Sequence, residues 1–171
     1  MQPSIRKSIF LENRKMKKIA ILLMTVVFCV TNYSCKDKKS EKGYTEFGIH
    51  HGECFGNCFK VFKISGTHLY QDTSKQYYTG PFNFQKSIEL SDGLYEYAHD
   101  MLQNVPEELK GNNSGVYGCP DCYDQGGIYF SLKENGDKSR FSIDPATTAD
   151  QSQELIDYKV KLNLVLDSLL N

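Results

Sequence analysis

Residues 128–143, which read IYFSLKENGDKSRFSI, decide the fold of this chain. Apolar residues occupy every second position from Ile128 to Leu132, and Phe141 and Ile143 continue that alternation beyond Asn135-Gly136. A period of two is typical of a strand that buries one face. An Asn-Gly pair between two such runs favours a type I′ turn, because both central residues of that turn need positive φ. The segment therefore predicts an antiparallel hairpin.

A second hairpin is predicted upstream. Residues 59–64 are β-branched and aromatic with lysines between them, which is the composition of a strand. Ser65-Gly66 turns the chain, and residues 68–71 form the return strand. A further short strand is expected over residues 75–79, and a Gly-, Asn- and Ser-rich loop is expected over residues 111–118.

Two segments have helical spacing. Ser91 or Asp92 is the expected N-cap of the first helix, and Pro106 ends it or follows just after it. Its apolar positions are Leu94, Tyr97, Ala98, Met101, Leu102 and Val105, and those of the second helix are Leu155, Tyr158, Leu162, Val165, Leu166 and Leu169. Hairpins followed by helices predict an α+β domain, mainly one antiparallel sheet of hairpins with two helices packed on one face.

The N-terminal part is typical of a targeting segment. Met16-Lys17-Lys18 precedes the uncharged, largely apolar run 19–30, which is shorter than the roughly 20 residues that span a bilayer. It therefore predicts a signal peptide rather than a membrane span. Residues 1–15 are polar and mixed in charge, unlike the start of a signal peptide, so Met16 is the expected first residue.

The end of that run resembles a bacterial lipoprotein signal. Ser34 stands directly before Cys35, and a charged stretch follows. The resemblance implies that Cys35 is the lipid attachment site and that its lipid anchors the protein to the outer membrane. The resemblance does not specify whether the domain is on the periplasmic face or on the cell surface. Ordinary secretion, with Cys35 as a spare thiol, is the alternative. The expected organisation is a leader over residues 1–35, a tether over 36–43 and one globular domain over 44–171.

The expected mature chain is acidic. From Lys36 onward it has 14 Lys and Arg against 20 Asp and Glu, which gives a net charge of −6. Nucleic-acid binding depends on clustered Lys and Arg that neutralise phosphates, so this class is excluded, as is peripheral binding to anionic lipid.

Four cysteines carry the only recognisable chemistry of the domain: Cys54, Cys58, Cys119 and Cys122. An even number in an exported domain predicts disulfides, and four cysteines allow three connectivities. A four-thiolate zinc site is the first alternative, and His50 or His51 could replace one thiolate. Otherwise these histidines are expected to be exposed residues before a turn. Thiol redox chemistry at Cys119-Pro120-Asp121-Cys122 is the second, although no helix follows to lower the thiol pKa.

Two motifs resemble those of uncharacterised Bacteroidetes lipoproteins. Residues 54–58, CFGNC, resemble a Cys-Phe-Gly-x-Cys element that leads into a hairpin, and residues 119–127, CPDCYDQGG, resemble a Cys-Pro-Asp-Cys-x-Asp-Gln-Gly-Gly element. Phe59 stands where that family has a proline. The resemblance implies local pairing, Cys54 with Cys58 and Cys119 with Cys122, but no activity, because the family's function is unknown.

These patterns favour a non-enzymatic binding or structural module of the cell envelope, with another envelope protein as a candidate partner. No catalytic residue and no cofactor is predicted. The alternative hypothesis is a metal-binding or thiol-redox domain that acts through Cys54, Cys58, Cys119 and Cys122. A flat aromatic patch on a sheet face would favour the first hypothesis, and a deep pocket converging on the cysteines would favour the second.

Overall fold

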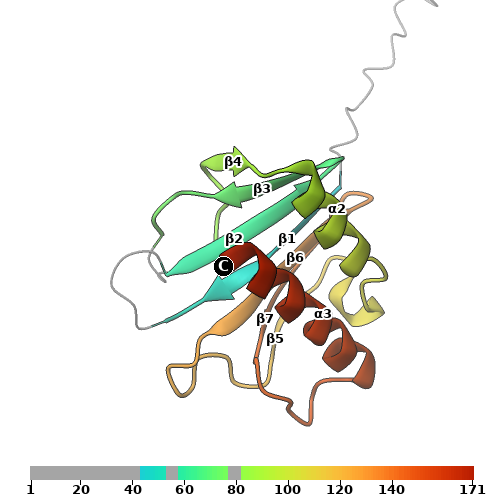
Figure 1. The fold of residues 1–171 in the computed structure, drawn as a ribbon. Helices are drawn as coiled ribbons and strands as arrows, with labels where there is room; N and C mark the ends of the chain where they lie inside the picture. Colours follow the sequence, from blue (N-terminus) through green and yellow to red (C-terminus); the bar gives the residue numbers. More distant parts are fainter. Residues whose placement is uncertain (1–42, 53–57, 77–81) are drawn as a thin grey trace, which may run out of the picture. The chain divides into compact units, whose positions relative to one another are not determined.

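Seven strands of the described residues form one sheet in the spatial order β4-β3-β2-β1-β6-β7-β5 (Figure 1). The computed structural model describes residues 43–52, 58–76 and 82–171, all within the unit Lys39–Asn171. The strands are β1 (Tyr44–His50), β2 (Phe59–Ser65), β3 (His68–Asp72), β4 (Ser87–Glu89), β5 (Ser114–Tyr117), β6 (Gly127–Glu134) and β7 (Asp137–Ile143). Neighbouring strands are antiparallel except β5 and β7, which are parallel. The predicted leader, Cys35 and all of the tether but Gly43 lie outside the described residues.

Two α-helices, α2 (Asp92–Met101) and α3 (Gln153–Leu170), lie on the same face of the sheet (Figure 1). A short 3-10 helix, η1 (Glu107–Leu109), follows α2. Ser152 caps α3, because its hydroxyl accepts a hydrogen bond from Leu155 N at 3.1 Å. The antiparallel hairpins and the two helices confirm the predicted α+β class. No helix in the described part of the chain is both long and apolar enough to cross a membrane.

The main core lies between the helices and the sheet. Phe47 of β1 stands opposite Phe62 of β2 and Phe130 of β6, and all three side chains are fully buried. Tyr158 of α3 packs edge-on against Phe130, with the ring centroids 5.8 Å apart. Its hydroxyl donates to Leu102 O at 3.1 Å, which ties α3 to the end of α2. Burial of each of these rings stabilises the fold by about 2–3 kcal/mol.

Both predicted hairpins are present. Asn135 and Gly136 have φ values of 54° and 94°, as a type I′ turn requires, and they join β6 to β7. Gly66 has a φ of 63° in the turn between β2 and β3. These turn residues therefore set the register of both pairs.

The sequence-based interpretation missed the central strand β1. Glu46 and His50 look like solvent-facing positions, yet they are 3 % and 2 % exposed, so the expectation that His50 is exposed is wrong. Both residues face the side of the sheet away from the helices, because Phe47 between them faces the core. Buried polar residues that have found partners conceal the apolar alternation by which a strand is recognised.

Two further expectations differ from the structure. The expected loop over residues 111–118 contains β5, which pairs in parallel with β7. The expected strand over residues 75–79 is wrong for residues 75–76, and the rest of it lies outside the described residues. The physical reason is the carboxylate of Asp72, which accepts from Ser74 N at 2.6 Å and from Gln85 N at 2.9 Å. These bonds draw the chain into a loop, and the strand beside β3 is β4.

The face of the sheet that carries no helix, here called the helix-free face, has a smaller apolar cluster of its own. Its buried members are Cys58, Phe59, Val61, Phe82 and Tyr129, with Phe84 packed against them. Because Phe82 and Phe84 come from the segment between β3 and β4, this part of the face is covered by a connection instead of a helix.

Candidate functional site

A pocket of about 360 Å³ lies on the helix-free face beside this apolar cluster. Its lining includes the aromatic residues Phe59, Phe82 and Tyr129, the polar residues His50, Arg140 and Ser142, and Ser114 and Val116 of the edge strand β5. A volume of this size is near the lower end of the range for pockets that hold small organic molecules. The pocket is therefore the candidate functional site.

The strand register explains why these side chains meet. Phe141 and Ile143 of β7 belong to the core under the helices, so Arg140 and Ser142 face the opposite side of the sheet. Arg140 stands opposite Ser131 of β6 and Ser114 of β5. One charged residue is thereby placed among the aromatic, aliphatic and polar residues that line the pocket.

His50 is held at the pocket by a polar contact with β7. Its Nε2 atom lies 2.7 Å from Ser142 Oγ, and its ring lies 5.9 Å from the ring of Phe59. Burial lowers the pKa of His50; the charge of Asp121 opposes this effect, and that of His51 adds to it. His50 is consequently a neutral hydrogen-bonding group at neutral pH.

The lowered pKa of His50 makes stability depend on pH. As the pH falls below the ordinary histidine value of about 6.5, the unfolded chain binds a proton at this position before the folded chain does. We expect the free energy of unfolding to fall over this window, and His50→Gln to remove part of that slope. Urea unfolding at a series of pH values measures it. The matched control is His99→Gln, at an exposed histidine of α2, and an identical slope in both variants would contradict the prediction.

His50 and Ser142 are at the distance of a base and its nucleophile, but the surroundings do not favour catalysis. Ser142 lies within the regular strand β7 rather than on a sharp turn. The carboxylate of Asp121 is already used, because it accepts from Gly52 N and from Gly126 N. We therefore interpret the contact as the means by which a buried histidine satisfies its hydrogen bond.

A second polar group lies next to the pocket, around Glu46. The hydroxyl of Tyr129 donates to Glu46 Oε2 at 3.3 Å, and Lys63 Nζ lies 3.2 Å from Glu46 Oε1. Burial, followed by the charge of Glu46, raises the pKa of Tyr129, so its hydroxyl stays protonated. The negative charge of Glu46 is thus balanced by Lys63.

Arg140 forms no such ion pair, but its charge and a side-chain hydrogen bond act on Tyr129, where they oppose the effect of Glu46 on the pKa of that hydroxyl. Arg140 forms no ion pair with a carboxylate anywhere in residues 43–52, 58–76 and 82–171. Its Nε atom is buried and has no hydrogen-bond partner among those residues. A guanidinium presents its donors in a fixed fork that fits planar oxyanions, so Arg140 is the group best suited to meet a ligand.

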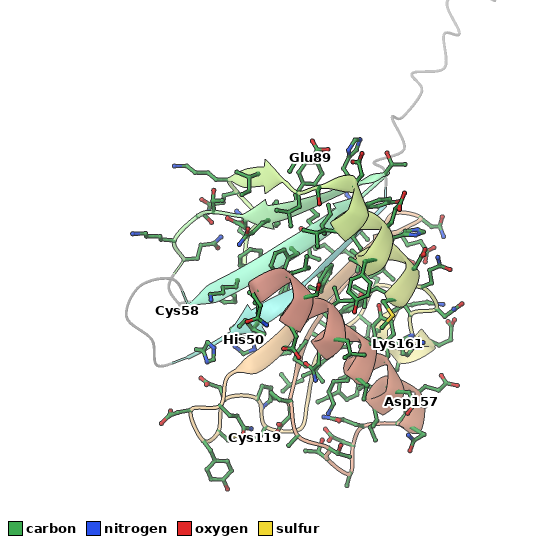
Figure 2. All side chains as sticks on the ribbon, in the orientation of Figure 1. His50, Cys58, Glu89, Cys119, Asp157 and Lys161 are labelled. Carbon is green, nitrogen blue, oxygen red and sulfur yellow. A yellow bond between two sulfur atoms is a disulfide. The ribbon has the colours of Figure 1, made fainter. Side chains whose placement is uncertain are left out.

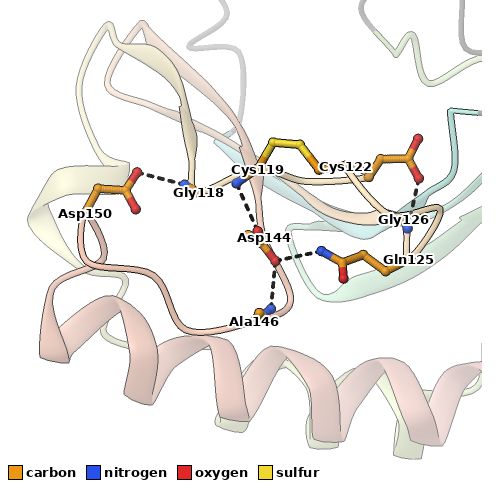
Figure 3. Close-up of a disulfide and its surroundings, with 9 residues drawn as sticks. Gly118, Cys119, Cys122, Gln125, Gly126, Asp144, Ala146 and Asp150 are labelled. Carbon is orange, nitrogen blue, oxygen red and sulfur yellow. Dashed lines mark hydrogen bonds between the residues drawn. A yellow bond between two sulfur atoms is a disulfide. The ribbon is translucent and has the colours of Figure 1, made fainter.

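The structure joins Cys119 and Cys122 as a disulfide, with their Cα atoms 5.5 Å apart (Figure 3). Cys58 is buried and also disulfide-bonded. Its predicted partner Cys54 lies outside the described residues, so that pairing stays a prediction. His51 N donates to Cys58 O at 3.0 Å, which places Cys58 at the same end of the sheet as His50, and Figure 2 shows the loop that contains Cys119 at that end too.

Aspartates hold the loop that carries the disulfide. Asp144 accepts from Cys119 N at 2.9 Å, from Gln125 Nε2 at 3.1 Å and from Ala146 N at 2.8 Å (Figure 3). Asp121 ties the loop to Gly52, as described above. Asp121 and Gln125 of this motif therefore have a structural explanation: Asp121 accepts from backbone N–H groups, and Gln125 donates to Asp144, in a loop that has no regular structure.

The two adjacent glycines of the same motif, Gly126 and Gly127, are required because His50 lies too close to leave room for a side chain. A Cβ atom on Gly126 would lie 2.6 Å from His50 O, and one on Gly127 would lie 2.3 Å from His50 Nε2. Gly126 also has a φ of 74°, a conformation that favours glycine. Both glycines thus let β6 begin directly beside the end of β1.

The cysteines do not form the pocket. None of Cys58, Cys119 and Cys122 lines it. No group of three or more metal-ligating side chains occurs within the described ranges. After Cys122 the chain enters β6 rather than a helix, so the helix N-terminus that activates redox cysteines is not supplied at this position.

A second cavity, of about 430 Å³, lies near the end of α2, beside η1 and α3. Its lining carries charges of both signs, including Asp157 and Lys161 of α3 (Figure 2) and the pair Lys110 and Glu107, whose Nζ and Oε1 atoms lie 2.6 Å apart. This mixture gives no preference for either sign of ligand charge.

No protein-family model matches the chain, and no curated protein matches it.

Sequence reasoning singled out the cysteines and missed Arg140, Tyr129 and Ser142. Their alternation with Phe130, Phe141 and Ile143 was the available signal, because it places them together on the face opposite the core.

Proposed function

We propose that this chain is a cell-envelope lipoprotein, anchored through Cys35, whose domain is a non-enzymatic module that binds a ligand in the pocket on the helix-free face. The observation that carries the proposal is the pocket itself: an aromatic wall with one charged residue, on a sheet face. Protein pockets for small molecules combine a mostly apolar lining with a few placed polar groups, as this one does.

The position of the pocket also supports binding over cysteine chemistry. Among the described cysteines, Cys119 and Cys122 lie in a loop and Cys58 lies directly before β2, whereas the pocket is lined by strand side chains and Phe82. Its described lining contains no carboxylate and no cysteine. The pairs of acid and base groups on which hydrolases rely are thus not part of this wall.

The binding proposal is tested with an uncharged aromatic compound, naphthalene carboxamide. Equilibrium dialysis of the full chain, with the same detergent in both chambers, measures its affinity. We expect Val116→Trp, which fills the pocket from the edge strand, to weaken binding at least about 10-fold. The matched control is Val160→Trp on α3, since Val116 and Val160 are 61 % and 55 % exposed. Carboxamide binding that is unaffected by Val116→Trp would reject this pocket as the binding site.

The metal and redox alternative is tested on the cysteines. Intact mass spectrometry of the exported chain, with alkylation before and after reduction, shows which thiols are free, and a zinc assay uses the same sample. We expect Cys54, Cys58, Cys119 and Cys122 to react only after reduction, with no zinc present, and Cys35 to carry the added mass of a lipid. Thiols that react without reduction, or zinc near one per chain, would instead favour a cysteine centre.

A further inference from the structure

We propose that the pocket takes a singly charged organic carboxylate, with Arg140 binding the carboxylate and an apolar or aromatic body lying against Phe59, Phe82 and Tyr129. This inference rests on the proposed function, that the pocket binds a ligand, and it names the ligand's class.

The charge balance around the pocket points to an anion. Glu46, the carboxylate that approaches Tyr129, already pairs with Lys63 at 3.2 Å. Asp121, whose charge acts on His50, is held by the backbone of Gly52 and Gly126. Arg140, which is half-buried, therefore carries its positive charge without a direct ion pair to a carboxylate in the described ranges, and its contact there is with the hydroxyl of Tyr129. A carboxylate that pairs with such a partly desolvated charge forms strong, charge-assisted hydrogen bonds.

A single carboxylate fits this charge better than a dianion. Arg140 is the one formally charged side chain of the described lining, because His50 is neutral at neutral pH and Tyr129 stays protonated. A guanidinium and a carboxylate match one to one in charge and form two parallel hydrogen bonds. Phosphate groups usually meet several cations or a helix N-terminus, and this lining offers neither.

The wall beside Arg140 selects the rest of the ligand. The ring of Phe82 lies 5.1 Å from that of Phe59 and 5.2 Å from that of Tyr129, measured between centroids. These tilted and edge-on rings pack closely against one another, and each belongs to the lining of the pocket that also contains Arg140. A small molecule that carries both an apolar ring and a carboxylate contacts both features at once, whereas a free inorganic anion contacts only one.

Three naphthalene compounds of equal size test the inference on the full chain by equilibrium dialysis: the carboxylate, the uncharged carboxamide and the methylamine. We expect the carboxylate to bind at least about 10-fold more tightly than the carboxamide, and the amine to bind most weakly. Arg140→Gln should reduce the preference for the carboxylate over the carboxamide to about twofold or less, chiefly by weakening carboxylate binding. The control is Lys138→Gln, which removes the same charge from the same strand and face and should preserve the preference.

The outcomes distinguish a wrong ligand class from a wrong binding site. If the carboxamide binds wild-type protein as tightly as the carboxylate does, or the amine binds best, the ligand class is wrong while the pocket remains a binding site. If none of the three compounds binds in a manner sensitive to Val116→Trp, the proposed function itself fails. The comparison of the three compounds on wild-type protein needs no variant, so it holds even if Arg140→Gln does not fold.

Discussion

Gly48→Ala is expected to lower the free energy of unfolding by about 3 kcal/mol. Gly48 lies in the middle of the central strand β1, and a Cβ atom there would lie 2.2 Å from Lys60 O and 2.7 Å from Val61 Cα. Both contacts are with the backbone of β2, which is fixed by its own ladder of hydrogen bonds. The added methyl therefore has to push two neighbouring strands apart.

Urea denaturation followed by circular dichroism measures the effect as a shift of the midpoint. The matched control is Gly93→Ala, the same substitution within α2, where no atom beyond the adjacent residues and the helix's own backbone lies within 4 Å of the added Cβ. That variant should gain about 0.5–1 kcal/mol, because alanine is the better helix former. Equal midpoints for the two variants would show that β1 does not approach β2 as closely as described.

Asp144→Ala is expected to lower the free energy of unfolding by about 3–4 kcal/mol, because it leaves three hydrogen-bond donors without their acceptor at a mostly buried position. Asp144 is 4 % exposed and binds Cys119 N, Gln125 Nε2 and Ala146 N. The stability of Asp144→Asn should lie between those of Asp144→Ala and wild type. An amide keeps one acceptor oxygen, but its NH₂ group faces a donor that the second carboxylate oxygen had accepted from.

The same denaturation measurement applies, with Asp150→Ala as the control. Asp150 also binds the loop that holds the disulfide, through Gly118 N at 2.7 Å, but it is exposed to solvent. Water can replace an exposed acceptor, so Asp150→Ala should lower the free energy of unfolding much less than Asp144→Ala does. If both substitutions cost the same, the burial of Asp144 is not what makes its hydrogen bonds valuable.

The elements that could be predicted from the sequence are those determined by residues close together in the chain. Asn135-Gly136 specified its turn through the backbone conformation that it favours, and α3 was visible from the spacing of its apolar residues. β1 could not be predicted because Glu46 and His50 are buried by partners from β2, β6 and β7, which lie far along the chain. Buried polar pairs of this kind have no local signature.

The candidate site shows the same division. The cysteines stand out in a sequence because their chemistry is rare, and the Cys119–Cys122 pair was expected from the family resemblance. Arg140 is unremarkable in a strand of mixed composition. Its role depends on the register with Ser131 and Ser114, and β5 itself was expected to be a loop. A pocket that needs a parallel edge strand is visible only once that strand is placed.

The pairing of β1 with β6 has a consequence for the order in which the domain forms. β2 with β3 and β6 with β7 are hairpins that close over a few residues, but Phe47 meets Phe130 only after most of the domain has been made. Closing so long a loop costs entropy before any contact repays it, which slows folding. We therefore expect the edge of β1 that faces β6 to stay unpaired during folding until the hairpin of β6 and β7 has formed and completes the sheet.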